Sequence, residues 1–148
     1  MTPFFLSQIL AGLSFGLDLL AFQFIRRQCS LLTLACSTSL LAFHFWLLGE
    51  SSACGLMALA ASRYLLAIVT TSQRVKGGFL CASVLCSGLT WQHPTDIFPL
   101  AGSLFMTIAA FQPTAAGLRL ITLGGSLCWL INNVLAGSPM AIAMESTF

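Results

Sequence analysis

Residues 31–48 read LLTLACSTSLLAFHFWLL, an apolar run that contains no Lys, Arg, Asp or Glu and ends at Gly49-Glu50. A helix that crosses a bilayer needs about 20 mostly apolar residues, because lipid offers no hydrogen-bond partner to the backbone N–H groups. The stretch is therefore typical of a membrane-spanning helix. The rest of the chain can be divided by the same criterion.

The composition of the whole chain supports this interpretation. Of its 148 residues, 57% are hydrophobic and only 7% are charged, whereas a soluble domain is about 25% charged. Such a chain cannot present a soluble surface, and intrinsic disorder needs the opposite balance of apolar and charged residues. The net charge of +2, with no basic stripe, excludes nucleic acid as a partner. We therefore expect an all-α, polytopic transmembrane helical bundle with the lipid bilayer as its main partner.

Six stretches are apolar enough to be read as full spans. They are residues 4–25, 31–48, 52–70, 79–91, 97–111 and 115–136. Residues 72–78, SQRVKGG, are expected to form a polar loop made flexible by its glycines. Pro139 suits the first turn of a helix, but residues 140–148 are too short to cross. This last piece is expected to be a truncated seventh span; if the chain is complete, it must be half-inserted or re-entrant.

Charged loop residues alternate between the two sides of the predicted bundle. Lys and Arg occur in the first and third loops and beside the fifth, as Arg26, Arg27, Arg74, Lys76 and Arg119. The second and fourth loops carry Glu50 and Asp96 instead, and the sixth carries no charge. Loop Lys and Arg prefer the cytoplasmic side of a membrane. The pattern therefore supports the span count and predicts an N-terminus outside the cytoplasm.

Two spans in each half of the chain resemble each other in order and spacing. Residues 40–49, LLAFHFWLLG, align with residues 128–137, CWLINNVLAG. Earlier in each half, Ala11-Gly12 aligns with Ala101-Gly102. Both matches are separated by about 90 residues, which indicates an internal repeat.

The repeat predicts two parallel three-helix units joined by one linking span, a 3+1+3 plan. The first unit covers residues 1–72, the linker helix residues 73–95, and the second, C-terminally truncated unit residues 96–148. The register places His44 opposite Asn132. Parallel three-helix repeats occur in transporters, whose sites lie between the repeats near the membrane midplane.

Four residues near the outer ends of the second and sixth spans are candidates for a substrate-binding site. They are His44, Trp129, Asn132 and Asn133. A neutral imidazole and amides exchange hydrogen bonds without bringing full charge into lipid, and Trp provides a flat apolar wall. We expect them to line an outward-facing cavity, with one of the two Asn residues facing its centre because neighbours on a helix point about 100° apart. The alternatives are an interhelical hydrogen bond for His44 and interfacial positions for Trp46 and Trp129.

Charged residues inside the spans are further candidates. A charge in the hydrocarbon costs about 2.5–3.5 kcal/mol, so such side chains usually face the bundle interior. Asp18 and Arg63 lie at comparable depth in the same half, and we expect them to form a buried ion pair; a pair that only stabilises the fold is the alternative to a transport role. Glu145 either reaches the interior as a proton-binding carboxylate or is exposed by truncation. The GxxxG pattern at Gly12 and Gly16 predicts close packing, within the first three-helix unit or across a homo-oligomer seam.

Four segments also carry a resemblance to a known family. They are residues 41–49, Ser62-Arg63, residues 128–138 and Glu145. With these segments the chain resembles, over nearly its whole length, the YgjV family of bacterial inner membrane proteins, which implies a multi-pass protein with its N-terminus in the periplasm by the charge pattern. The family usually has His-Asn where this chain has Asn132-Asn133, and its members continue beyond residue 148. More distantly, the 3+1+3 plan is similar to SWEET, PQ-loop and nicotinamide riboside transporters, in which paired positions of the repeats line a central pocket.

The sequence contains no phosphate-binding loop of the form GxxxxGK[ST] and no HExxH metal motif. His44 and His93 have no Cys at metal-ligand spacing. We therefore expect no enzyme activity, no cofactor and no metal. The function that we predict is transport or facilitated passage of a small polar solute, whose identity the sequence does not contain. The alternative is a non-transporting membrane scaffold or the partner subunit of a membrane complex.

Overall fold

The computed structural model describes residues 2–21, 23–24, 26–70, 72–111 and 115–147. These residues form seven α-helices and one short 3-10 helix, with no strand among them. In chain order they are α1 (Pro3–Ala21), α2 (Arg27–Leu48), α3 (Ser51–Val69), α4 (Gln73–Thr90), η1 (Pro94–Asp96), α5 (Ile97–Ala110), α6 (Ala115–Leu135) and α7 (Pro139–Thr147). The predicted all-α fold is confirmed.

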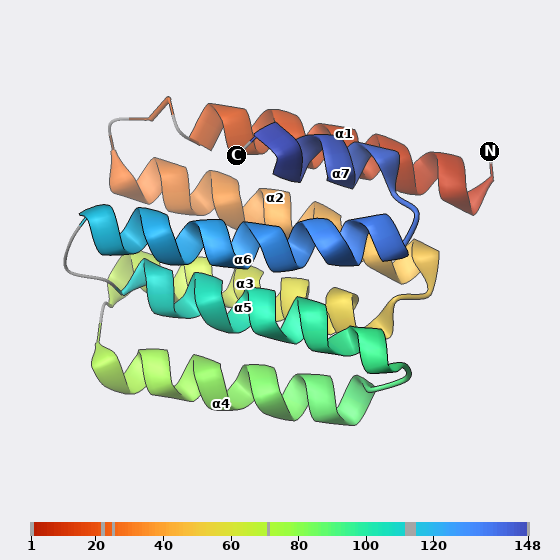
Figure 1. Ribbon diagram of the computed structural model, residues 1–148. Helices are drawn as coiled ribbons and strands as arrows, with labels where there is room; N and C mark the ends of the chain where they lie inside the picture. The colour runs from red at the N-terminus through yellow and green to blue at the C-terminus, as the bar shows by residue number, and fades with distance from the viewer. Residues whose placement is uncertain (1, 22, 25, 71, 112–114, 148) are drawn as a thin grey trace.

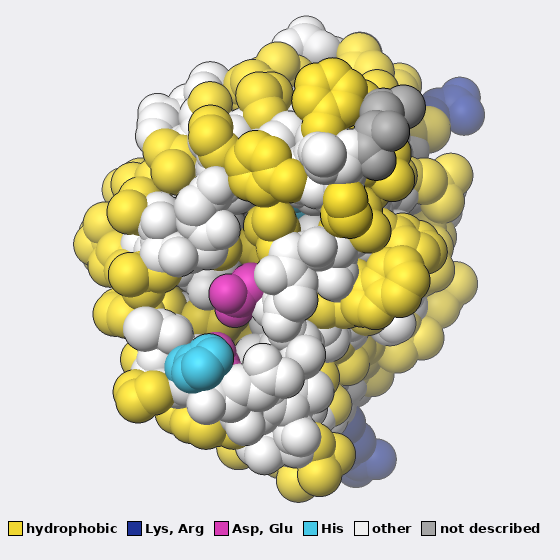
Figure 2. Space-filling model, turned by 90° about the vertical axis from the view of Figure 1, so that its right-hand side faces the viewer, with side chains coloured by type: hydrophobic (Ala, Val, Ile, Leu, Met, Phe, Trp, Pro, Cys, Tyr) yellow, Lys and Arg dark blue, Asp and Glu magenta, His cyan; other side chains and the backbone are white. Residues whose placement is uncertain are grey.

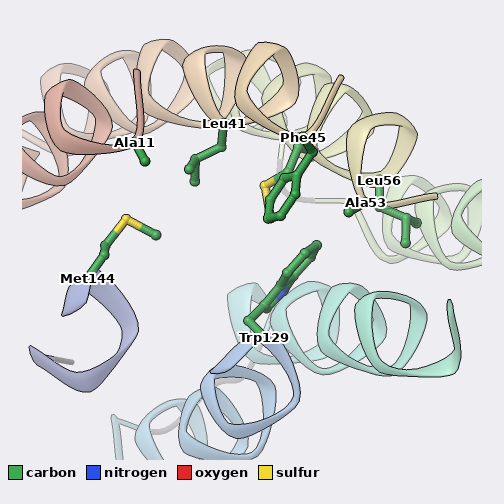
Figure 3. Packing of buried hydrophobic residues seen from close by; sticks show 8 residues of the cluster. Ala11, Leu41, Phe45, Ala53, Leu56, Trp129 and Met144 are labelled. Atoms are coloured by element: carbon green, nitrogen blue, oxygen red, sulfur yellow. The ribbon is translucent and has the colours of Figure 1, made fainter. Parts of the chain in front are cut away.

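Six of the helices surround a common core, and α4 lies outside them. Consecutive helices run in alternating directions (Figure 1). α1 packs against α7 as well as α2, and α3 packs against α5 as well as α2. Helices α1, α2 and α3 therefore face α5, α6 and α7 across the core (Figure 3). α4 packs against α3 and α5 at the outer edge of the bundle.

The helices suit a membrane by length and composition. Within the described part of the chain, α1, α2 from Leu31 onward and α3 are long and apolar enough to cross a bilayer, and Leu123–Leu135 of α6 forms a shorter apolar helix. Large apolar side chains cover the outside of the bundle, for example Phe43, Leu85 and Leu127. Exposing such a surface to water is unfavourable, whereas lipid solvates it well. The fold is therefore that of a membrane helical bundle.

Helix α4 begins earlier than the sequence indicated. The expected loop at residues 72–78 is helical from Gln73 onward, so that prediction is wrong. The Ser72 hydroxyl accepts a hydrogen bond from the N–H of Arg74 at 3.3 Å and caps the helix. Each glycine costs a helix about 1 kcal/mol relative to alanine, a modest cost that capping and packing against α3 and α5 offset.

Two glycines end α2 and α6 in the same way. Gly49 and Gly137 have φ angles of 80° and 66°, in the left-handed region, which glycine adopts freely because it has no Cβ. In each case the N–H of the glycine bonds to the carbonyl of the residue three positions before it. The N–H of the following residue bonds to the carbonyl five positions before itself. This is the Schellman pattern, which satisfies carbonyl groups at a helix end.

Helix α7 is attached to α1 by a side-chain cap. α7 begins at Pro139, which confirms the helix start expected there. The Gln8 side chain on α1 accepts hydrogen bonds through Oε1 from the N–H of Met140 at 3.2 Å and from the Ser138 hydroxyl at 3.4 Å. The first turn of α7 therefore finds its acceptor on the opposite half of the molecule.

The two ends of the bundle differ in charge. The N-terminal ends of α2, α4 and α6 lie together at one end (Figure 1). That end holds Arg26, Arg74 and Lys76, while the side chains of Arg27 and Arg119 lie outside the described residues. The opposite end, which Figure 2 views directly, carries Glu50, His93 and Asp96; acidic and His side chains lie near its middle, and Lys and Arg are visible only at its edges.

An apolar cluster lies between the two groups of three helices. Its buried members are Ala11, Leu41, Phe45, Ala53, Leu56, Met57, Trp129 and Met144. Side chains from α1, α2 and α3 point toward Met144 of α7 and Trp129 of α6 (Figure 3). The cluster therefore joins the two halves of the bundle.

Candidate functional site

His44 is fully buried near the C-terminal end of α2. Its Nδ1 atom lies 2.8 Å from the backbone carbonyl oxygen of Ser7 in α1. Because a carbonyl only accepts hydrogen bonds, Nδ1 carries the proton and the neutral ring presents a lone pair at Nε2. Nε2 is buried and has no hydrogen-bond partner among the described residues. His44 therefore forms an interhelical hydrogen bond and keeps one acceptor unused.

Asn132 and Asn133 are buried near the C-terminal end of α6, with 4% and 1% of their surfaces exposed. The Nδ2 atom of Asn133 donates a hydrogen bond to the carbonyl oxygen of Ala141 in α7 at 3.4 Å. In the described part of the chain, Asn132 Nδ2 and Asn133 Oδ1 have no partner. Buried polar atoms without partners are rare, because each loses its hydrogen bonds to water. Both Asn residues therefore retain hydrogen-bonding capacity inside the bundle.

Trp129 lies where the two halves meet. Its ring centroid is 6.0 Å from that of Phe45 in α2, and Phe45 in turn packs edge-on against His44 at 4.9 Å. On α5, Gly102 lies so close that an added Cβ would be 2.7 Å from the indole Nε1. Trp129 is 3% exposed, whereas Trp46 is 66% exposed. Of these two residues, Trp46 therefore has the outward position of an interfacial aromatic residue.

The four predicted binding residues share one end of the bundle, but their hydrogen bonds stay within each half. His44 bonds to α1 and Asn133 to α7, while Trp129 and Phe45 face each other between the halves (Figure 3). Two apolar surface grooves lie elsewhere, one beside α1 and α2 and the other between α4 and α5. Neither groove is lined by the predicted binding residues. All four side chains are buried, with at most 4% of their surfaces exposed.

The structure does not bring Asp18 and Arg63 together. α2 lies between α1 and α3, and the Arg63 side chain turns the other way, where its Nη1 donates a hydrogen bond to the Thr107 hydroxyl of α5. Its guanidinium also lies 5.0 Å from the centre of the Tyr64 ring. Asp18 instead interacts with the Ser37 hydroxyl of α2. Equal depth in the membrane was not sufficient for the expected ion pair, because the two side chains face different neighbours.

Asp18 has a second carboxyl group nearby. Glu145 of α7 lies within electrostatic range of Asp18 across the contact between α1 and α7, and near Ser126 of α6. Both carboxyl groups are partly buried. Glu145 therefore reaches the inside of the bundle, and the two acidic side chains of the spans lie where the first half meets the second.

The two glycines of the GxxxG pattern in α1 have different surroundings. A Cβ added to Gly12 would lie 3.3 Å from the Met140 side chain of α7, whereas one added to Gly16 would meet nothing within 4 Å. Gly12 thus lies close to the second half of the bundle. Ser14 between them is fully buried and 2.7 Å from the Ser37 hydroxyl, so the letters G-x-S-x-G found here form no strand-to-helix turn of the kind that exposes a hydrolase nucleophile.

Outside the spans, Glu50 has a perturbed environment. Burial raises the pKa of its carboxyl, the nearby Asp96 carboxylate raises it further, and His93 acts in the opposite direction. The Asp96 carboxylate accepts hydrogen bonds from the N–H groups of Gln92 at 2.7 Å and His93 at 3.2 Å. Among the described residues, no group of three or more His, Cys, Asp or Glu could hold a metal ion.

Sequence reasoning missed the residues that contact the candidates. The Thr107 hydroxyl accepts a hydrogen bond from the Arg63 guanidinium, and Phe45 connects His44 with Trp129. Thr107 belongs to no motif, and Phe45 lies in the repeated segment but was not singled out. One signal was available for Thr107: it lies four residues after Ser103 on α5, so the two hydroxyls share one helix face. Small polar residues at this spacing in an apolar helix indicate a face that packs against protein and not against lipid.

Comparison with known proteins gives two matches. A family model described as Imp-YgjV, bacterial inner membrane protein, matches residues 5–148. The chain is also similar to Inner membrane protein YgjV of Escherichia coli (strain K12), with 27% identity over 151 residues that cover 100% of this chain and 81% of the relative. No solved structure matches. Since the family model covers nearly the whole chain and the fold is a bundle of apolar helices, this protein belongs to the YgjV family of bacterial inner membrane proteins.

Proposed function

We propose that this protein is a small-solute transporter or facilitator whose substrate site lies between two three-helix units. One observation carries the proposal. His44 and Asn132 occupy the same place in the two aligned segments, and each is buried with a polar atom that lacks a partner among the described residues. A polar solute between the halves would complete these hydrogen bonds.

The 3+1+3 plan is part of this proposal, and the helix boundaries support it. α2 and α6 end at the aligned glycines Gly49 and Gly137, and α3 and α7 each begin at the second residue after that glycine. The packing is also symmetric, because α1 contacts α7 and α3 contacts α5. In this plan residues 1–72 and 96–148 are the repeats and residues 73–95 the linker. Transporters built from repeats work by rocking one unit against the other.

The proposed site offers both donors and acceptors. His44 Nε2 and Asn133 Oδ1 accept hydrogen bonds, and Asn132 Nδ2 donates. Trp129 and Phe45 lie between the halves with their ring centroids 6.0 Å apart, so they must separate before a solute enters. The structure then corresponds to a closed state, and opening requires the two halves to move apart at this end.

The proposed orientation places the N-terminus in the periplasm. Arg26, Arg74 and Lys76 gather at one end of the bundle, and Lys and Arg of short loops stay on the cytoplasmic side. His44 lies near the opposite end, six residues before Glu50 in the loop after α2. In this orientation the proposed site therefore opens toward the periplasm.

A second candidate function is a membrane scaffold or partner subunit, and one observation favours it. The contact between the halves is an apolar cluster that includes Leu56, Trp129 and Met144. A carrier whose halves separate must expose this apolar surface during each cycle, at about 25 cal/mol per Å² if water enters. A scaffold would keep the cluster closed permanently.

Uptake by proteoliposomes separates the two functions. The full chain is reconstituted and incubated with a mixture of polar metabolites, and accumulated solutes are identified by mass spectrometry against protein-free vesicles. We expect at least one solute to accumulate, and His44→Ala and Asn132→Ala each to lower its uptake roughly tenfold, since each removes a hydrogen bond worth about 1 kcal/mol or more at a buried site. Ser62→Ala is the matched control, because Ser62 is exposed and bonds to its own helix.

Two results would contradict the transport proposal. One is an uptake profile equal to that of protein-free vesicles for every solute. The other is unchanged uptake in both variants, which would place the site elsewhere. Thermal unfolding of each variant shows whether lost uptake reflects the site or the fold.

A further inference from the structure

Arg63 is a buried cation that no acidic side chain of the chain neutralises. It is 4% exposed and lies about two-thirds of the way along α3. The chain has four Asp and Glu residues in total, all among the described residues. Asp18 and Glu145 lie near each other at the contact between α1 and α7, and Glu50 and Asp96 lie at the far end of the bundle. Since Arg stays protonated in proteins and an unpaired charge in a membrane is costly, binding of an anion beside Arg63 would be favourable.

The guanidinium also has unused hydrogen-bonding capacity. Thr107 accepts a hydrogen bond from Nη1, whereas Nε is buried and has no partner among the described residues. The Nε–H and the neighbouring Nη2–H form the edge of an Arg side chain that binds carboxylate or phosphate groups through two parallel hydrogen bonds. The hydrogen bond with Thr107 therefore leaves Nε, on the edge of Arg63 that suits an oxyanion, without a partner among the described residues.

The surroundings of Arg63 are polar along the seam between α3, α4 and α5. Thr107 is fully buried and donates its own hydroxyl to the carbonyl oxygen of Ser103 at 2.8 Å. The Ser103 hydroxyl is in turn 3.4 Å from that of Ser83 in α4. The seam beside Arg63 is therefore lined by small hydroxyl side chains, which add no negative charge to it.

The neighbouring part of α4 leaves room. α4 runs antiparallel to α3, and Gly55 of α3 contacts Cys86 of α4, where an added Cβ would be 2.6 Å from the sulfur. Arg63 lies eight residues after Gly55 on α3, and Gly78 lies eight residues before Cys86 on α4. Because the rise per residue is the same in both helices, Arg63 and Gly78 lie at the same level. A Cβ added to Gly77 or Gly78 would meet nothing within 4 Å. No side chain therefore projects from α4 at these two positions, which lie at the level of Arg63.

This level is close to the basic end of the bundle. Arg74 and Lys76 lie in the first turn of α4, immediately before Gly77, and Arg74 is exposed. Clustered positive charges raise the local concentration of anions. An anion that approaches this end meets the exposed cations first and the buried one after them.

We infer that Arg63, with Thr107 beside it, forms a binding site for an oxyanion, the carboxylate or phosphate group of a solute or lipid, that reaches the seam between α3, α4 and α5 from the basic end. The site lies away from His44 and Asn132 and does not depend on the proposed transport role. It assigns Arg63 a ligand in place of an ion pair within the chain.

Thermal unfolding in nanodiscs tests this inference. The full chain is placed in phosphatidylcholine nanodiscs, and its unfolding temperature is measured with sodium phosphate and with sodium chloride at matched ionic strength. We expect phosphate to raise the unfolding temperature in a saturable manner, because a ligand that binds only the folded state stabilises it. Arg63→Gln is expected to weaken phosphate binding roughly 10- to 100-fold, the loss of a charge-assisted pair. Arg26→Gln, an exposed Arg at the same end, should respond like the wild type.

Further measurements keep the test decisive. Arg63→Lys preserves the charge but not the two-donor edge, so it should fold and still bind phosphate about tenfold more weakly. Phosphatidylglycerol nanodiscs without added phosphate form the second arm; stabilisation there that Arg63→Gln abolishes identifies a lipid headgroup as the source of the oxyanion. Equal effects of phosphate and chloride together with no Arg63-dependent effect of phosphatidylglycerol would overturn the inference, as would wild-type phosphate binding by Arg63→Lys and Arg63→Gln.

Discussion

The indole of Trp129 lies against the backbone of Gly102, so that a Cβ at position 102 would be 2.7 Å from Nε1 and 2.8 Å from Cδ1. The two residues belong to α6 and α5, and Trp129 also faces Phe45 from the other half of the bundle. A glycine at this position on α5 is therefore what allows the largest core side chain to reach the contact between the halves.

Gly102→Ala should destabilise the protein by about 1–3 kcal/mol, the usual effect of overpacking a core, because the indole must move away from its place beside Phe45. Gly88→Ala is the matched control, since Gly88 also lies within a helix but an added Cβ would meet nothing within 4 Å. Chemical unfolding in detergent measures both. Equal stability of the two variants would contradict the close contact.

A hydrogen bond between α1 and α2 offers a second test. The hydroxyl oxygens of Ser14 and Ser37 are 2.7 Å apart, and both residues are fully buried. We expect Ser14→Ala and Ser37→Ala each to cost about 1 kcal/mol, with a coupling of about 0.6 kcal/mol in a double-mutant cycle, typical of membrane helices. Exposed Ser62→Ala should cost nothing measurable. A coupling of zero would show that the two hydroxyls do not bond.

Gln8 should hold the start of α7. Replacing it by Leu removes the acceptor for the N–H of Met140, which now lies 3.2 Å from Oε1, and we expect a loss of about 0.5–2 kcal/mol by analogy with other helix caps. Amide hydrogen exchange at residues 140–142 should become faster while exchange in α2 is unchanged. Gln28→Leu, on an exposed residue, is the control. Unchanged exchange in α7 after Gln8→Leu would contradict the cap.

The stability of the protein should depend on pH through Glu50. Burial, and then the nearby Asp96, raise the pKa of Glu50 above its ordinary value of 4.5, so the folded state binds this proton more tightly than the unfolded chain. The resulting stability is fully present below the unfolded pKa and is lost as the pH rises through the folded pKa.

Glu50→Gln removes that titration. The variant should unfold at the same temperature as the wild type in acid and at a higher temperature near neutral pH. A series of thermal unfolding curves at increasing pH, in one detergent and at one ionic strength, measures the difference. A variant that is less stable than the wild type at neutral pH would show that ionised Glu50 is favourable in the fold.

Most helices could be predicted from the chain, and the exceptions have local causes. The ends at Gly49 and Gly137 follow from the need for a left-handed residue, and the start at Pro139 follows from its fixed φ. The start of α4 could not be found by hydropathy, because all of residues 73–78 except Val75 are polar or glycine, although Ser72 caps them into a helix. Hydropathy measures the preference of a segment for lipid and does not detect capping.

The candidate site was predictable only in part. His44, Trp129 and both Asn residues are polar or large side chains in the two segments that align with each other, which predicts that they face the bundle interior. The structure buries all four. The hydrogen-bond partners of His44 and Asn133 could not be predicted from the sequence. Ser7 and Ala141 bind through backbone carbonyl groups, which every residue has, so no pattern of side chains can indicate which of them is used.

The sequence alone determined that this chain forms a series of membrane helices, because a bilayer accepts apolar helices whose backbone hydrogen bonds are internal. It also determined that the helices alternate in direction and that the basic loop residues gather at one end. The tertiary structure alone decided which side chains meet. Distance along a helix sets depth, but the rotation of each helix about its axis and the identity of its neighbour set the contacts. For this reason Arg63 contacts Thr107 and Asp18 lies near Ser37, although their equal depth predicts a pair between Asp18 and Arg63.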